Sequence, residues 1–166
     1  MVAARLAAAA AVAALATQGC GAAQTRPPVE HFPVQGSVAE AARAGGFKVP
    51  FSAAIRVGDV LYLSGAIGTA PDGKLPQGIE AQTRQTMENI RSVLARAGLG
   101  FGGVFRCLVM LEDMADWPAF NRVYTTYFED GRLPARSALG ADGLALGALV
   151  EVECQAHAPE GERPRG

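Results

Sequence analysis

The chain has 166 residues and nearly equal numbers of cationic and anionic side chains, which gives a net charge of −1. Such a balance provides no cationic field for a phosphate backbone, so we expect no nucleic-acid partner. The length suits one domain with a sizeable core.

The N-terminus has the pattern of a secretory signal. A basic start at Arg5 precedes an alanine-rich apolar run over 6–16, which is too short to span a bilayer. We therefore assign 1–23 to a signal peptide and expect an exported protein, periplasmic or secreted. Two forms of processing are open, cleavage at Ala14-Leu15-Ala16 or lipidation of Cys20. The first is favoured because the residues before the cysteine depart from the bacterial lipobox.

A lipid anchor at Cys20 would be the one membrane contact of this protein. A third interpretation of the same segment is an unprocessed, disordered N-terminus. Residues 24–46 then form an N-terminal segment that we expect to be partly disordered. It contains an edge strand over 29–34 and a loop or weak helix over 38–43.

The main domain is predicted over 47–158, and its pattern is clear from Phe51 onward. Two β-rich runs at 53–57 and 60–64 are separated by Gly58-Asp59, which is the pattern of a hairpin.

Two amphipathic helices follow. In the first, over 79–97, the larger side chains recur every three or four residues until Gly98 ends the pattern. A mostly apolar strand over 104–112 separates it from the second helix, which Asp116 caps and Pro118 enters in the first turn. The second helix carries an aromatic stripe that we assign to the core, made of Phe120, Val123, Tyr124, Tyr127 and Phe128.

Two strands over 135–140 and 148–157 complete the domain. If they pair as a hairpin centred between Gly143 and Leu144, Arg136 lies opposite Glu151. A guanidinium offers a planar fork of donors that matches a carboxylate, and a carboxyl group can orient a water and move a proton. This pair would be enough to hold a small carboxylate and assist hydrolysis.

The order of elements predicts an α+β fold. Each helix has one apolar face, so the two helices should cover one face of a single mixed sheet. The other face of the sheet must then be covered by closure of the sheet on itself, be buried by oligomerisation, or remain exposed to solvent. The polar tail over 159–166 is rich in proline, glycine and charge and should be disordered.

The cysteines and histidines leave one question open. Export would allow a disulfide between Cys107 and Cys154, whereas the shared parity of Cys154 and Val152 favours a buried free thiol. His31 and His157 are far apart in the sequence and neither accompanies a cluster of ligands, so we expect no metal site.

A set of short segments in the main domain has a characteristic order and spacing. They are Pro50-Phe51-Ser52, Arg56-Val57-Gly58-Asp59, Leu63-Ser64-Gly65, Gln82-Thr83-Arg84-Gln85-Thr86-Met87-Glu88-Asn89, Leu111-Glu112-Asp113-Met114, Asn121 with Tyr124 and Phe128, Pro134-Ala135-Arg136-Ser137, and Val150-Glu151-Val152-Glu153. Together they resemble the RidA (YjgF) family of reactive-intermediate deaminases.

The resemblance implies a chorismate-mutase-like α+β fold that assembles as a homotrimer with clefts between subunits. It also implies hydrolysis, without a cofactor, of enamines and imines such as 2-iminoacids to 2-oxoacids and ammonia. The partners expected on this basis are a small carboxylate-bearing substrate and two further copies of the chain.

The resemblance also implies the site residues. Arg136 would bind the substrate carboxylate, Glu151 would place or activate the water, and Ser64 would contact the substrate. Phe51 and Ala138 would line the pocket, where the best-known relatives have tyrosine and cysteine.

A further departure is Ala66, where many relatives have glutamine. The missing phenol hydroxyl at position 51 removes a hydrogen bond of about 0.5 to 1.5 kcal/mol. These departures indicate reduced activity or a changed substrate.

Other interpretations of these residues remain open. Without the resemblance, Arg136 would be assigned to a salt bridge, Ser64 to the end of a strand and Glu153 to a solvated or interface carboxylate. Asn121 would brace a loop. Two other functions are a non-catalytic module of the same fold that binds small carboxylates or proteins, and a ribonuclease, which fits poorly with the near-neutral charge.

Overall fold

The computed structural model describes residues 27–46 and 48–159 of the chain. The predicted signal peptide at 1–23, the predicted lipidation site at Cys20 and the predicted tail beyond Pro159 lie outside the described residues.

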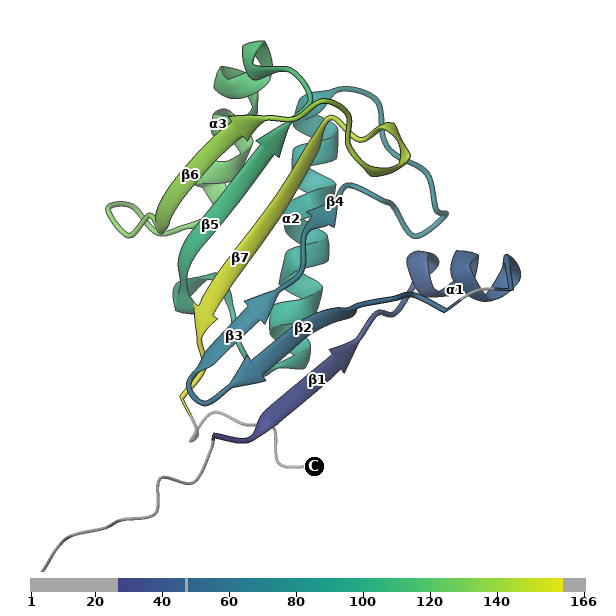
Figure 1. Cartoon of the computed structure of the whole chain (residues 1–166). Helices are drawn as coiled ribbons and strands as arrows, with labels where there is room; N and C mark the ends of the chain where they lie inside the picture. Colours follow the sequence, from purple (N-terminus) through teal and green to yellow (C-terminus); the bar gives the residue numbers. More distant parts are fainter. Residues whose placement is uncertain (1–26, 47, 160–166) are drawn as a thin grey trace, which may run out of the picture.

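The described residues form seven strands and three α-helices (Figure 1). The strands are β1 Val29–Pro33, β2 Ser52–Val57, β3 Val60–Leu63, β4 Ala66–Ile67, β5 Val104–Leu111, β6 Ala135–Gly140 and β7 Val150–His157. The helices are α1 Ser37–Ala44, α2 Ile79–Arg96 and α3 Trp117–Tyr124.

All strands belong to one mixed sheet. Its order is β1-β2-β3-β7-β5-β6, and the short β4 pairs with β7 beyond the end of β3. The β5–β6 pair is parallel and the other pairs are antiparallel. The predicted α+β architecture is confirmed, as is the β2–β3 hairpin, in which Gly58 takes a positive φ of 55°.

The predicted hairpin between the last two strands is wrong. β5 lies between β6 and β7, so Arg136 is in register with Cys107 and Glu151 with Met110. The reason is that β5, α3 and β6 form a strand–helix–strand unit, whose crossover makes the two strands parallel. The segment after β6 then crosses the end of β5, where Ala141 N donates to Leu111 O and the carbonyl of Leu149 accepts from Glu112 N.

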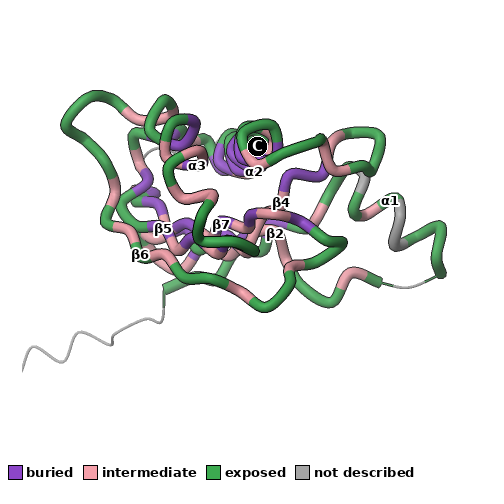
Figure 2. Tube along the Cα trace, turned by 90° about the horizontal axis from the view of Figure 1, so that it is seen from above, coloured by how far each residue is buried: buried purple, intermediate pink, exposed green. Residues whose placement is uncertain are grey.

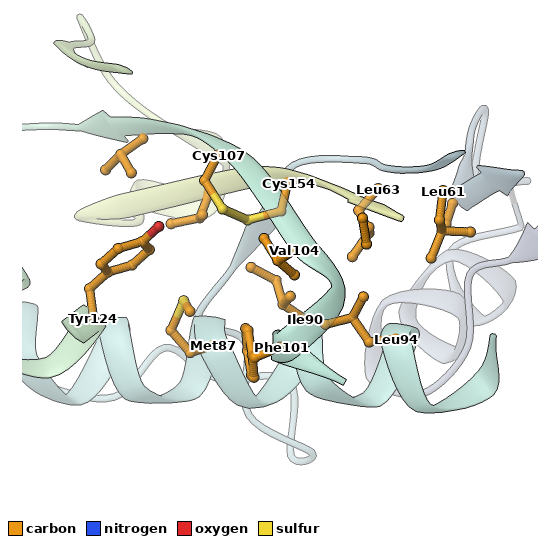
Figure 3. Close-up of a cluster of buried hydrophobic side chains, with 14 of the residues drawn as sticks. Leu61, Leu63, Met87, Ile90, Leu94, Phe101, Val104, Cys107, Tyr124 and Cys154 are labelled. Carbon is orange, nitrogen blue, oxygen red and sulfur yellow. A yellow bond between two sulfur atoms is a disulfide. The ribbon is translucent and has the colours of Figure 1, made fainter. Parts of the chain in front are cut away.

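α2 and α3 lie on one face of the sheet, as predicted (Figure 2). The amphipathic pattern of α2 directs its larger apolar side chains toward the strands, and Gly98, with a φ of 76°, follows its end. The core lies between this helix and β3, β5 and β7 (Figure 3), and its buried members include Leu61, Leu63, Met87, Ile90, Leu94, Val109, Val150 and Val152. None of the described helices has the length and apolar character needed to cross a membrane.

α3 differs in detail from the prediction. It ends at Tyr124, and the rest of the aromatic stripe lies on a 3₁₀ turn over Thr125–Tyr127 and the residue after it. The side chain of Asp116 makes no capping hydrogen bond, whereas Asp113 Oδ1 accepts from Ala115 N one turn earlier. The assignment of Phe120 and Tyr124 to the core is confirmed, because both are buried.

The N-terminal segment contains the predicted edge strand and weak helix, as β1 and α1. β1 pairs with β2 at the edge of the sheet, and α1 lies beyond the end of β1 and the start of β2, away from α2 and α3 (Figure 1).

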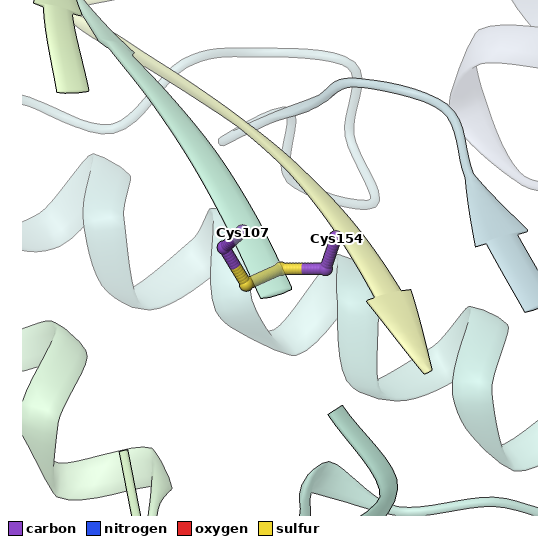
Figure 4. Close-up of a disulfide and its surroundings, with 2 residues drawn as sticks. All are labelled: Cys107 and Cys154. Atoms are coloured by element: carbon purple, nitrogen blue, oxygen red, sulfur yellow. A yellow bond between two sulfur atoms is a disulfide. The ribbon is translucent and has the colours of Figure 1, made fainter. Parts of the chain in front are cut away.

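A disulfide joins Cys107 of β5 to Cys154 of β7 (Figure 4). The two residues are direct partners in the antiparallel register, with Cα atoms 4.1 Å apart, and both face the helices. The alternative of a free buried thiol at Cys154 therefore does not describe this structure. The shared parity of Cys154 and Val152 did identify the correct face.

Candidate functional site

Arg136 lies on β6, the edge strand of the sheet. Its register partner Cys107 faces the helices, so Arg136 points to the same face and reaches the aromatic side chains of α3. Its guanidinium carbon lies 4.4 Å from the ring centroid of Trp117, 4.7 Å from that of Tyr124 and 5.7 Å from that of Phe120.

This packing leaves Arg136 ready for an anion. Among the ion pairs within residues 27–46 and 48–159, none involves Arg136. A guanidinium attracted to ring faces keeps its N–H groups, which lie in its own plane, directed away from those faces. Burial raises the pKa of Tyr124 to about 12 although the Arg136 charge lowers it, so the phenol stays neutral beside the cation.

Ala138 follows on the same face of β6 and is half-buried against the core. Its methyl group leaves more space at this position than a larger side chain would. The structure therefore places the predicted pocket residues Arg136 and Ala138 together at one edge of the sheet.

Glu151 lies on β7, between Ile67 of β4 and Met110 of β5. Its neighbours Val150 and Val152 are buried toward the helices, so Glu151 points to the opposite, outer face. It is half-buried there. Burial raises the pKa of the Glu151 carboxyl above its ordinary value, and the negative charge of Glu153 raises it further.

The carboxyl group of Glu151 lies directly against the backbone of Gly65. A Cβ atom at Gly65 would overlap Glu151 Oε1 and would lie 2.9 Å from Glu151 Cδ. A side chain at position 65 would therefore displace the flexible end of the Glu151 side chain from this place. Glycine at the break between β3 and β4 leaves room for the carboxyl group in its observed position.

Ser64 precedes this glycine and ties it to the start of β2. Its Oγ donates to Ser52 O at 2.7 Å, and its backbone N donates to Ala53 O at 2.9 Å. The hydroxyl proton is engaged in this structure, so Ser64 supports the site, and its contact with substrate stays a prediction.

Phe51 comes just before Ser52, and its side chain is 52% exposed. It borders a cavity of about 260 Å³ between α1 and the adjoining ends of β1 and β2. The other residues that line this cavity are Pro33, Val34, Ala39, Arg43, Lys48 and Val49.

The predicted site residues thus fall into three groups. Ser64 and Glu151 lie together on the outer face, whereas Arg136 and Ala138 lie on the helix face. Phe51 lies apart from both, at the cavity beside α1. Arg136 and Glu151 are two strands and three residues apart in register, about 14 Å between Cα atoms at ordinary sheet spacings. One chain cannot bring both groups to the same small substrate.

Sequence reasoning missed the elements that hold Glu151. β4 has two residues, too few for a recognisable alternating pattern. Asn89 of α2 donates to Ile67 O and Thr69 O, and the Gln82 side chain accepts from Leu149 N. The sequence did contain a signal for this attachment, because Gln82 and Asn89 both belong to the motif over 82–89 and lie on one face of the helix.

No group of three His, Cys, Asp or Glu side chains among residues 27–46 and 48–159 is placed to hold a metal ion. The chemistry available at these positions is that of a guanidinium, a carboxyl group with a raised pKa and backbone amides.

Comparisons with known proteins identify the family of this chain. The model of a family described as Endoribonuclease L-PSP matches residues 43–158. A 2-iminobutanoate/2-iminopropanoate deaminase of Mus musculus is 39% identical over 106 residues, which cover 63% of this chain and 78% of the mouse protein. The chloroplastic Reactive Intermediate Deaminase A of Arabidopsis thaliana is 36% identical over 107 residues, covering 63% and 57% of the two chains.

A solved structure gives the same result for the fold. The crystal structure of a protein of unknown function of the conserved Rid protein family, from Yersinia pestis, is similar with a TM-score of 0.63 and 37% sequence identity. The match covers 65% of this chain and 87% of that one.

Proposed function

The chain belongs to the Endoribonuclease L-PSP family, which includes the RidA (YjgF) deaminases, and from this premise we propose that it hydrolyses reactive enamines and imines. The proposed substrates are 2-iminoacids, and the products are 2-oxoacids and ammonia. No cofactor takes part in this reaction.

The observation that carries the proposal is the state of Arg136. Its guanidinium is held by aromatic faces and forms none of the ion pairs within the described residues. Aromatic faces position the cation without neutralising it. A substrate carboxylate can therefore take the two parallel hydrogen bonds that a guanidinium fork offers.

The chemistry needs little beyond this anchor. A protonated 2-iminoacid has an electrophilic carbon, to which one water adds as it loses a proton to Glu151. The C–N bond then breaks, the nitrogen leaves as ammonia, and the carbon becomes the carbonyl of the 2-oxoacid. Glu151 first returns its proton to that nitrogen, and the hydroxyl proton of the tetrahedral adduct passes to the departing ammonia to give ammonium, so Glu151 ends as the carboxylate it was at the start.

We further propose a homotrimer in which a cleft takes Arg136 from one subunit and Glu151 from its neighbour. The separation of the two residues within one chain supports this arrangement. The outer face of the sheet also carries large apolar side chains, of which Tyr62 is 45% and Leu139 46% exposed. Burying this face against other copies would stabilise the assembly.

Export is a further part of the proposal. Disulfides persist in oxidising compartments and are rare in the cytosol, so the Cys107–Cys154 bond fits the predicted signal peptide. A periplasmic or secreted deaminase would act on imines released outside the cytoplasm.

The test is the decay of 2-iminoacids generated in situ by an amino-acid oxidase and trapped by semicarbazide. The protein should accelerate the loss of the trapped signal. Arg136→Ala removes both the charge and the two parallel hydrogen bonds, whereas Arg136→Lys keeps the charge and loses the two parallel hydrogen bonds. Each variant should lower kcat/KM by roughly 100-fold, or about 3 kcal/mol.

Arg122→Ala is the matched control, because this exposed arginine of α3 pairs with Glu80. It should keep full activity. Saturable carboxylate binding by an intact assembly without turnover of any 2-iminoacid would instead identify a binding module.

A further inference from the structure

Two amide side chains of α2 bind the backbone around Glu151. Gln82 and Asn89 are seven residues apart, so they stand on the same face of the helix two turns from one another. Asn89 Nδ2 donates to Ile67 O at 2.9 Å and to Thr69 O at 3.0 Å. Gln82 Oε1 accepts from Leu149 N at 2.8 Å.

The backbone groups that they bind lie in or beside the two strands β4 and β7: Ile67 is in β4, Thr69 follows it, and Leu149 comes just before β7. Ile67 of β4 is the register partner of Glu151, and Leu149 is two residues before it. Gln85 Nε2 also donates to Asn89 Oδ1 at 2.9 Å, which fixes the orientation of the Asn89 amide. Both strands that meet at Glu151 are therefore attached to α2 at this point.

β4 depends on this attachment. A strand of two residues has too few ladder hydrogen bonds to hold its place alone. At Gly68, just after β4, an added Cβ would lie 2.6 Å from Gln82 O, so this backbone packs directly on that of α2. Gly65, just before β4, contacts the carboxyl group of Glu151 on the outer face of the sheet, the face opposite to α2.

We propose that Gln82 and Asn89 are positioning residues of the deaminase site, which hold β4 and the start of β7 so that the Glu151 carboxyl lies against Gly65. The inference rests on the proposed function. Neither amide bonds to Glu151 itself, so both act through the backbone of Ile67, Thr69 and Leu149.

The location of Arg136 makes the expected kinetic effect specific. Arg136 lies two strands away on β6 and is held by α3, so its binding of the substrate carboxylate should not depend on these amides. Loss of Gln82 or Asn89 should therefore lower kcat, while KM stays within about twofold of its original value.

The variants are Gln82→Met and Asn89→Leu, which keep the approximate size of each side chain and remove its hydrogen bonds. We expect kcat to fall about 10- to 100-fold, as displacements near 1 Å do in other enzymes. Gln82→Glu should retain most of kcat, because it keeps the acceptor for Leu149 N and places a carboxylate in the first turns of α2, where the helix dipole favours it.

Thr86→Val is the matched control. Thr86 lies between the two amides on α2, is fully buried and has no hydrogen-bond partner for its hydroxyl among the described residues. It should keep kcat near the wild-type value. A loss of kcat in Thr86→Val equal to that in the amide variants would overturn the inference, because disturbance of α2 alone would explain both.

A second readout does not depend on turnover. In protein labelled with ¹³C at the Glu carboxyl groups, the Glu151 signal, assigned with Glu151→Gln, should titrate above its ordinary pKa of 4.5. In Gln82→Met and Asn89→Leu its pKa should move toward 4.5 as water reaches the carboxyl. Glu153 is the charged neighbour on β7, while the partners on β4 and β5, Ile67 and Met110, carry no charge.

The two readouts separate the two proposals. If the wild-type protein turns over no 2-iminoacid, the proposed function fails and the titration still decides the role of the amides. If both amide variants leave kcat and the Glu151 titration unchanged, the inference fails while the deaminase function stands.

Discussion

Arg136 and Glu151 are held in opposite ways. Arg136 is positioned by side chains, since the rings of Trp117, Tyr124 and Phe120 pack around its guanidinium. Glu151 is positioned by backbone, since its carboxyl lies on Gly65 and its strand neighbours are bound to α2. A permanent cation tolerates apolar aromatic faces, whereas a carboxyl group there would lose its charge.

Under the proposed function, the two residues also have different roles. An anchor needs a charge in a fixed place, and aromatic packing provides that at the edge of the sheet. A group that transfers protons needs a pKa above its ordinary range, and half-burial beside Glu153 raises the pKa of Glu151. The two requirements are met on opposite faces of one sheet.

The strongest test of this division is to separate the two groups between chains. Arg136→Ala and Glu151→Gln should each be nearly inactive alone. When the two variants are co-expressed in equal amounts and mixed trimers are isolated, activity should return to about a third of the wild-type value. In every mixed trimer, one of the three clefts combines an intact Arg136 with an intact Glu151 from the neighbouring subunit.

The control is co-expression of Arg136→Ala with the double variant Arg136→Ala, Glu151→Gln, because trimers of these two chains contain no intact Arg136. Native mass spectrometry shows whether mixed trimers form. Mixed trimers without regained activity would mean that Arg136 and Glu151 of neighbouring subunits do not act in one cleft.

The disulfide connects the two regions, because Cys107 neighbours Arg136 in register and Cys154 lies on the strand of Glu151. It closes a loop with a sequence separation of 47. The double variant Cys107→Ala, Cys154→Ala should lose about 4 kcal/mol of unfolding free energy, from the chain entropy that the bond removes. Denaturant titration measures this loss.

Activity of the folded double variant should be close to that of the wild type, because neither sulfur lies among the reacting groups. The single variants Cys107→Ala and Cys154→Ala should lose as much stability as the double variant or more. A double variant as stable as the wild type would show that the disulfide adds no unfolding free energy to that of the β5–β7 pairing.

The aromatic packing of Arg136 predicts a smaller effect. Trp117→Leu should raise KM for 2-iminoacids about tenfold, since a desolvated cation–π contact contributes about 1 to 2 kcal/mol to holding the guanidinium. The value of kcat should change little, because Glu151 lies on the other face. Steady-state kinetics separates the two constants.

Tyr124→Phe is the matched variant, because it keeps a ring face beside Arg136 and removes only a hydroxyl. That hydroxyl is buried and has no hydrogen-bond partner among the described residues. KM should stay unchanged and stability should stay equal or rise. An increase in KM equal to that of Trp117→Leu would assign the hydroxyl, rather than the ring, to the site.

Local patterns predicted most of the elements correctly. The 3.6-residue period of α2 and the Gly58-Asp59 turn of the first hairpin each depend on neighbours in sequence, and the structure has both. β4 was missed because two residues carry no period. The end of α3 was misplaced because its aromatic stripe continues into a 3₁₀ turn with the same buried face.

The order of the strands could not be read in the same way. The segment after β6 has the glycines of a hairpin, yet it crosses the end of β5, because the β5–α3–β6 crossover already occupies that edge. Hydrogen-bond partners in a sheet are chosen by the packing of helices over it, which involves residues far apart in sequence.

The family, the amphipathic helices and the residue types of the candidate site could be predicted from the sequence, because they depend on side-chain chemistry and short-range spacing. Only the tertiary structure decided that Arg136 and Glu151 face opposite sides of the sheet, that Cys107 meets Cys154, and that Gly65 makes room for a carboxylate. Each of these follows from strand order and register. A shift in register by one residue would turn every side chain of a strand to the other face of the sheet, and a different strand order would change its partners.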